Sequence, residues 1–310
     1  IVINLNNNTT YSSSNGNLHR TTLSGNLAII PICIIIFILA SNVTVLRVFS
    51  RWSKQLQIQH YFMMGLALAD LMTIPPYIVS LIILIRGELW LTNHQCNWLG
   101  IAMTMTIEAT ACIHSLMCIE KCASVLKPIE HKICSSRRSS KLVAIGEVSG
   151  CCLAPLVFNL ILLHSNKIYF VFDPFAPTCT IGSSIDILLT VGVAFMFLPM
   201  LIQIFTHALI IAKLFKLTGV SRARAFRASK TIFMTVGIYY LCWAPVASQF
   251  IWIAGGKSNP PGWFVFVSLQ ILQMNSGMSL VIYVVTLPHF KVYKRLSNRV
   301  RIAPSNQTQH

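Results

Sequence analysis

The chain has 310 residues, of which 55% are hydrophobic and only 10% are charged, and its mean hydropathy is +0.66. This small number of charged groups cannot cover the surface of a soluble protein. The composition therefore excludes a soluble globular fold and places the chain in lipid. The formal net charge of +16 would suggest a nucleic-acid partner in a soluble protein, but its distribution along the chain argues against nucleic acid.

Seven apolar stretches follow one another along the chain, and each is long enough to cross a bilayer as a helix. They are continuous apolar runs without in/out alternation, which predicts helices rather than barrel strands. The predicted spans are 27–49, 61–85, 96–120, 142–163, 185–214, 229–254 and 263–287. The predicted fold class is therefore all-α: an integral membrane bundle of seven transmembrane helices within residues 27–288.

The basic residues indicate which side of the membrane each loop faces. Twenty of the 24 lysines and arginines lie in one set of loops and in the C-terminal segment. The other set has only Arg20, Arg86, Lys167 and Lys257. Because positive charge collects on the cytosolic side, we expect an extracellular N-terminus and a cytosolic C-terminus.

The two ends of the chain are polar. Residues 1–26 are predicted to form an extracellular tail glycosylated at Asn7 or Asn8, and no cleavable signal sequence is evident. Residues 289–300 have apolar and basic faces typical of a short amphipathic helix on the membrane surface, with a solvated tail as the alternative. Residues 301–310 are expected to be a cytosolic tail.

The cysteines divide by the compartment that they face. Of the ten cysteines, only Cys96 and Cys179 fall on the predicted outer side. The exterior is oxidising, so this pair is predicted to form a disulfide bond. The other eight are membrane-buried or cytosolic, and their spacing is not that of a zinc site.

Ionisable residues in a membrane span are expensive, so they are candidates for function. Asp70, Glu108 and Glu147 lie in the second, third and fourth spans. Oxygen-bearing side chains on other spans accompany Asp70, namely Asn42, Thr110, Asn275, Ser276 and Ser279. This set favours a hydrated core or a monovalent cation site, with Na⁺ at Asp70 as the candidate ion. Interhelical hydrogen bonding that only holds the bundle together is the alternative.

The sixth span contains Cys242-Trp243-Ala244-Pro245. Proline removes a backbone hydrogen bond and kinks a helix, which makes Pro245 a candidate pivot and Trp243 a bulky side chain just beneath any outer cavity. A passive kink is an equally good interpretation of this segment alone.

These features occur in a characteristic order over about 270 residues. The positions are Asn42, Leu66-Ala67-Leu68-Ala69-Asp70, Trp90, Cys96 with Cys179, Glu120-Lys121-Cys122, Pro155, Pro199, Cys242-Trp243-Ala244-Pro245, Asn275-Ser276 and Tyr283. Together they resemble rhodopsin-like (class A) G-protein-coupled receptors, of which the chain looks like a divergent member. The resemblance implies an outer ligand pocket, a sodium-linked core at Asp70, and a cytosolic face that engages a heterotrimeric G protein or arrestin.

The chain departs from this family at the positions linked to coupling. Glu120-Lys121-Cys122 stands where the family has Asp-Arg-Tyr, and lysine lacks the planar fork of arginine. The segment from Ser279 to Tyr283 lacks the family's proline, and His207 replaces a tyrosine of the fifth span. Coupling of the usual strength is therefore in question.

The resemblance also places the ligand pocket. Met103 occupies the position of the ammonium-binding aspartate of aminergic receptors, and Gln273 occupies that of the opsin lysine, so a biogenic amine held in the usual way and covalent retinal are not expected. The predicted lining is Met103, Thr104, Ile107, Glu108, Trp243, Gln249, Phe250, Gln270 and Gln273. Such a mostly apolar lining suits a small molecule or a short peptide. Glu108 is either a partner for a cationic ligand or a buried structural acid.

The sequence bears on four functional classes. The first is a plasma-membrane receptor that binds an extracellular ligand and activates a G protein. The second is a receptor-like protein with weak or no coupling that acts constitutively or as a homo- or heterodimer partner. A transporter or channel is disfavoured because no inverted repeat or filter-like loop is visible. An enzyme is disfavoured because no catalytic set of residues can be recognised.

Overall fold

The computed structural model describes residues 25–51, 58–87, 90–135, 138–173, 177–183, 197–254 and 260–286. Asn7, Asn8 and the segments 289–300 and 301–310 lie outside the described residues, so glycosylation, the membrane-surface helix and the cytosolic tail remain predictions. The first part of the predicted fifth span, residues 185–196, also lies outside them.

Helices dominate the described chain, which is accompanied by one small sheet. The first four elements are a 3₁₀ helix (Gly25–Ala28), α1 (Ile29–Arg51), α2 (Ile58–Met72) and α3 (Ile74–Arg86). Next come α4 (Asn93–Leu126), α5 (Pro128–Ser135), α6 (Arg138–His164), β1 (Ile168–Asp173) and β2 (Thr178–Ser183). The last helices are α8 (Leu198–Lys216), α9 (Gly219–Ala254) and α10 (Gly262–Thr286).

The predicted membrane spans are confirmed. In the described residues seven helical stretches are long and apolar enough to cross a bilayer, one for each predicted span. They are Asn26–Arg51, Ile58–Arg86, Asn93–Leu126, Lys141–His164, Leu198–Lys216, Ser229–Gln249 and Gly262–Thr286. The chain is a multi-pass membrane protein.

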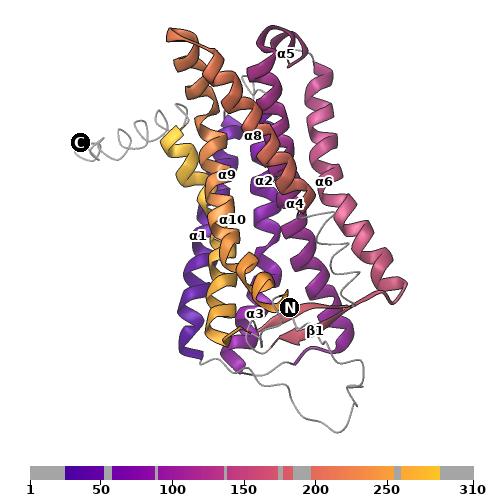
Figure 1. Ribbon diagram of the computed structural model, residues 1–310. Helices are drawn as coiled ribbons and strands as arrows, with labels where there is room; N and C mark the ends of the chain where they lie inside the picture. The colour runs from indigo at the N-terminus through magenta and orange to yellow at the C-terminus, as the bar shows by residue number, and fades with distance from the viewer. Residues whose placement is uncertain are drawn as a thin grey trace, which may run out of the picture.

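The bundle is organised around α4, which packs against α2, α6, α8 and α9 and also contacts both strands. The two strands pair antiparallel, with Phe172 opposite Cys179. This hairpin lies at one end of the bundle and α5 at the other, so the two ends are easily told apart (Figure 1). They are called here the hairpin end and the α5 end.

The second span is one apolar stretch in the sequence but two helices in the structure. Pro75 and Pro76 come two and three residues after Thr73, and neither has a backbone N–H to donate to the preceding turn. The Thr73 hydroxyl instead donates to the Asp70 carbonyl oxygen at 2.7 Å, and Tyr77 N donates to the Thr73 carbonyl oxygen at 3.2 Å. The break therefore follows immediately after the turn that carries Asp70.

Two loop predictions at the α5 end are wrong. The predicted spans 185–214 and 229–254 left residues 215–228 as a loop, but α8 continues to Lys216 and α9 begins at Gly219. Residues 128–135, expected in another loop, form α5. In α9, charge ends the apolar stretch without ending the helix, because arginine and alanine are good helix formers. α5 is a separate helix that begins at Pro128, and proline suits the first position of a helix.

Candidate functional site

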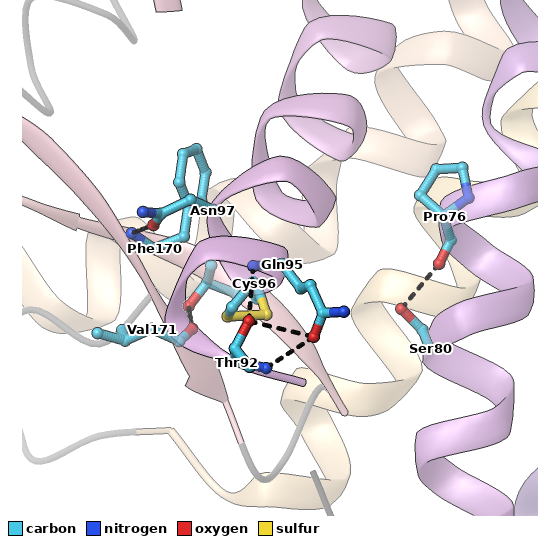
Figure 2. Close-up of a disulfide and its surroundings, with 10 residues drawn as sticks. Pro76, Ser80, Thr92, Gln95, Cys96, Asn97, Phe170 and Val171 are labelled. Carbon is cyan, nitrogen blue, oxygen red and sulfur yellow. Dashed lines mark hydrogen bonds between the residues drawn. A yellow bond between two sulfur atoms is a disulfide. The ribbon is translucent and has the colours of Figure 1, made fainter. Parts of the chain in front are cut away.

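The disulfide bond between Cys96 and Cys179 joins the start of α4 to β2, which confirms the predicted pairing. Thr92 caps α4 beside it, with Gln95 N donating to Thr92 Oγ1 at 3.3 Å and Thr92 N donating to Gln95 Oε1 at 2.9 Å. Figure 2 shows this cap and the disulfide together. The helix start and the hairpin are thus held as one unit.

β1 is fastened to α4 at a second point. The Phe170 N–H donates to Asn97 Oδ1 at 3.0 Å (Figure 2). The Phe170 ring lies directly over Gly100, where a side chain would collide with it. The hairpin therefore covers the hairpin end of α4 in a defined position.

A small cavity lies in the middle of the bundle, and residues from both predicted sites line it. Its volume is about 20 Å³, which is room for about one water molecule. Its lining is Thr73, Thr106, Ile107, Thr110, Tyr239, Trp243, Leu272, Gln273, Asn275 and Ser276. Ile107, Trp243 and Gln273 come from the predicted ligand pocket, whereas Thr110, Asn275 and Ser276 come from the predicted polar core.

The other residues of the predicted ligand pocket whose side chains the structure describes do not line this cavity. Gln270 Oε1 accepts a hydrogen bond from the Tyr77 hydroxyl, which links α10 to α3. Met103 and Thr104 are half-buried on α4. Gln249 has a buried amide nitrogen without a hydrogen-bond partner in the described chain, and the Phe250 side chain lies outside what the structure describes.

Asp70 stands in a buried polar cluster that joins three helices. The Ser276 hydroxyl hydrogen-bonds to the Asp70 carboxyl group. Asn42 Nδ2 donates to the Ser276 carbonyl oxygen at 2.8 Å and to the Ile38 carbonyl oxygen at 3.0 Å. Asp70 Oδ1 and Asn42 Oδ1 are buried without a hydrogen-bond partner among the described residues. Two unsatisfied oxygens, one of them on a carboxyl group, fit a hard monovalent cation.

Glu108 faces away from the cavity. It is 1% exposed, and its Oε2 accepts a hydrogen bond at 2.7 Å from Nδ2 of Asn159 on α6. The same Asn159 nitrogen lies 2.9 Å from the Pro155 carbonyl oxygen. The structure therefore places Glu108 between α4 and α6 as a helix-joining acid, and not among the residues that line the cavity.

Trp243 belongs to an aromatic column that continues toward the α5 end. Its ring centroid lies 5.7 Å from that of Tyr239, and the Tyr239 ring lies 5.0 Å from the ring of His114 on α4. His114 Nδ1 and the Tyr239 hydroxyl are buried without a hydrogen-bond partner in the described chain. Pro245 follows Trp243 in α9, where Ser248 Oγ donates to its carbonyl oxygen at 2.7 Å.

At the α5 end, Glu120 and Lys121 have separate surroundings. Glu120 Oε1 lies 2.7 Å from Nε2 of His131, so the last turns of α4 are tied to α5. Lys121 is only 8% exposed although it carries a charge. Cys122 packs with Val125 and two α8 residues in an apolar cluster.

His207 and Tyr283 lie on different helices. His207 is on α8, with Nδ1 2.7 Å from the Gln203 carbonyl oxygen and its ring 5.1 Å from that of Phe233. Tyr283 is fully buried in the main apolar core, one turn beyond buried Ser279.

Residues 41–302 match the family described as 7 transmembrane receptor (rhodopsin family). The chain belongs to this family. The match runs from the middle of α1 to beyond the end of α10, so it covers the second half of α1 and every later helix of the bundle. The family is one of receptors and is generally not enzymatic. A comparison with curated proteins gave no match.

Several residues of the receptor's polar interior escaped prediction. Asn159 is visible as a polar residue in an apolar stretch, and this signal could have suggested a partner for Glu108. His114 and Tyr239 are also polar positions within spans, but nothing local indicates that their rings meet. His131 gives no sequence signal for its contact with Glu120, because the contact depends on how α5 folds back.

Proposed function

We propose that this receptor lies in the plasma membrane with its hairpin end outside, binds an extracellular small molecule or short peptide there, and activates a heterotrimeric G protein at its α5 end. The observation that carries the proposal is the shared cavity. Trp243 and Gln273 of the predicted ligand pocket and Ser276, the hydrogen-bond partner of Asp70, line the same small space. A ligand that moves Trp243 would therefore act directly on the polar core.

A receptor of this kind works by population shift. An agonist must bind one arrangement of the helices more tightly than the other, because equal affinity for both shifts nothing. The small cavity helps, since a movement at Trp243 cannot be absorbed by empty space and must pass to neighbouring side chains. Arrestin is a second candidate partner for the same face.

The test is basal and ligand-stimulated G-protein activation in cells, measured with a panel of G-protein sensors at matched surface expression. Asp70→Asn and Lys121→Arg are expected to change the signal, because they alter the polar core and the buried cation at the α5 end. Lys167→Arg is the matched control, since Lys167 is exposed just before β1, at the opposite end of the bundle from the G-protein face. Silence of every sensor, with ligand libraries included, would refute G-protein activation.

Orientation has its own test. An epitope tag at the N-terminus should be labelled by antibody on intact cells, and a C-terminal tag only after permeabilisation. Glycosidase treatment should reduce the apparent mass, and the Asn7→Gln, Asn8→Gln double variant should abolish that shift. The opposite labelling pattern would overturn the orientation.

We also propose that Na⁺ binds at Asp70, supported by the unsatisfied oxygens of Asp70 and Asn42. Binding to the folded state alone raises stability by about 2.7 kcal/mol at a hundredfold excess over the dissociation constant. The purified receptor should therefore melt at a higher temperature in NaCl than in the chloride of a large organic cation. Asp70→Asn should remove this difference, and an unchanged difference would exclude the site.

A second candidate role, as a homo- or heterodimer partner with weak coupling, is favoured by α6. Only 11% of the apolar segment with which α6 spans the membrane is buried inside the bundle, the lowest share among the described spans. Gly146 and Gly150 on it have no atom within 4 Å of an added side chain, and exposed Glu147 lies between them. Close helix packing and a partner for Glu147 would both follow from dimerisation through this face.

Energy transfer between donor- and acceptor-tagged copies tests this role. Gly150→Leu should lower the transfer by blocking the close approach of two α6 helices. Gly237→Leu is the matched control, because Gly237 is exposed on α9 with nothing within 4 Å. Equal transfer in both variants would rule out α6 as the interface.

A further inference from the structure

An apolar groove lies between α8 and α9 at the α5 end of the receptor. Its volume is about 630 Å³, within the range of small-molecule sites. The lining residues are Ile211, Leu214, Phe215, Gly219, Arg222, Ala223, Phe226 and Phe233. Arg222 is the only charged side chain among them. The groove is thus hydrophobic, with one basic side chain in its lining.

The groove opens toward the surroundings of the bundle. On α8, Ile210 and Leu214 are buried against α4. Ile211 and Phe215, on the other face of the same helix, are 44% and 73% exposed. Phe226 on α9 is 54% exposed. The apolar walls therefore face outward, where a membrane-spanning helix meets lipid.

The groove also lies at the level of the membrane surface. α8 ends as a span at Lys216, and the span within α9 begins at Ser229. Phe215 stands one residue before the first of these limits, and Arg222 and Phe226 stand within two turns of the second. Aromatic and basic side chains at this level typically contact headgroups and the first carbons of the acyl chains.

The rim of the groove is strongly cationic. The Arg222 guanidinium carbon lies 5.8 Å from the centre of the Phe215 ring. Lys216 follows Phe215, and Lys230 lies one helical turn beyond Phe226. No Asp or Glu occurs anywhere in residues 187–310, so neither helix offers a carboxylate to these cations. Both ion pairs found within the described chain lie elsewhere, on α4 and α5.

We propose that this groove binds one anionic phospholipid of the cytosolic leaflet, with an acyl chain along Ile211 and Phe233 and the phosphate at Arg222. The apolar length of the groove requires a chain, which a free phosphate lacks. The uncompensated cations require an anionic headgroup, which phosphatidylcholine lacks. An amphipathic peptide would match only the apolar lining of the groove. An anionic lipid matches the apolar lining, the cationic rim and the position at the membrane surface.

Native mass spectrometry of the purified receptor with an equimolar mixture of phosphatidylserine and phosphatidylcholine tests the proposal. The wild-type receptor should retain one phosphatidylserine in preference to phosphatidylcholine. Arg222→Gln should lower that retention about fivefold, the effect of one basic residue near an anionic surface. Ala223→Phe, which fills the groove without changing charge, should lower it at least as much.

The matched control is Arg47→Gln, which removes an exposed charge near the C-terminal end of α1, outside the groove. An equal loss in Arg47→Gln would show a general attraction to the protein's charge and overturn the site. Competition by soluble glycerophosphoserine as strong as that by the diacyl lipid would show a free-phosphate site instead. Retention unchanged in Ala223→Phe would also overturn the proposal and leave the groove to a protein partner.

Discussion

Whether Gly100→Ala stabilises or destabilises the receptor depends on one contact, that between residue 100 and the Phe170 ring. An ideal Cβ at Gly100 would lie 1.9 Å from Cδ1 and 2.5 Å from Cε1 of Phe170. Phe170 is 5% exposed, so its neighbours leave the ring little room to turn, and its backbone N–H is held by Asn97 Oδ1. In an unobstructed helix, glycine to alanine stabilises by about 0.5–1 kcal/mol. Here the clash should reverse that sign, because overpacking costs about 1–3 kcal/mol.

The assay is the thermal midpoint of the purified receptor, followed by a thiol-reactive dye that reports exposure of buried Cys118 and Cys122. Gly100→Ala should lower the midpoint. Gly237→Ala, where nothing lies within 4 Å, should leave it unchanged or raise it. Both variants replace glycine with alanine, and they differ in whether another residue contacts the added methyl group.

A second substitution that removes the clashing ring makes the test more specific. Phe170→Ala alone should cost about 3–5 kcal/mol, because it opens a cavity under the hairpin. Once that ring is gone, the methyl group at position 100 has room, so the double variant should be no less stable than Phe170→Ala. If the two losses add, or if Gly100→Ala is as stable as the wild type, the packing described for the hairpin is wrong.

Three further predictions concern contacts between helices. Asn159→Leu removes the donor to Glu108 and should destabilise the receptor by about 1–3 kcal/mol in a melting experiment; an unchanged midpoint would contradict the contact. His131→Leu frees Glu120 and should speed amide exchange in α5 by mass spectrometry while changing global stability by less than about 1 kcal/mol. Gly277→Ala would bring its Cβ to 2.3 Å from an aromatic ring of α1 and should lower the melting midpoint by about 1–3 kcal/mol.

What the sequence predicted well depends on chemistry that is local along the chain. A membrane span is an apolar stretch of fixed length, so the seven spans could be derived without tertiary contacts. The pairing of Cys96 with Cys179 could also be derived, because the predicted topology left no other cysteine on that side.

The missed features depend on which residues meet across helices. Thr73 follows Asp70 in an uninterrupted apolar stretch, so the helix break there is visible only through the prolines that come after it. Glu108 shares a helix face with pocket candidates by spacing, yet its hydrogen bond goes to Asn159 on α6. Periodicity gives the faces of a helix but does not identify the neighbour of each face.

The choice between a functional polar core and simple interhelical hydrogen bonding depends on buried polar atoms that lack a hydrogen-bond partner. Asn42 Oδ1, Asp70 Oδ1, His114 Nδ1 and the Tyr239 hydroxyl are buried on four helices without a hydrogen-bond partner in the described chain. A network that served only to hold the bundle together would satisfy these atoms or replace them with apolar ones, because a half-satisfied buried network is less stable than either. In a membrane no solvent offsets the deficit. Tyr239 and Ser276, the hydrogen-bond partner of Asp70, line the cavity next to Trp243, which favours a core that trades stability for response to an ion or ligand.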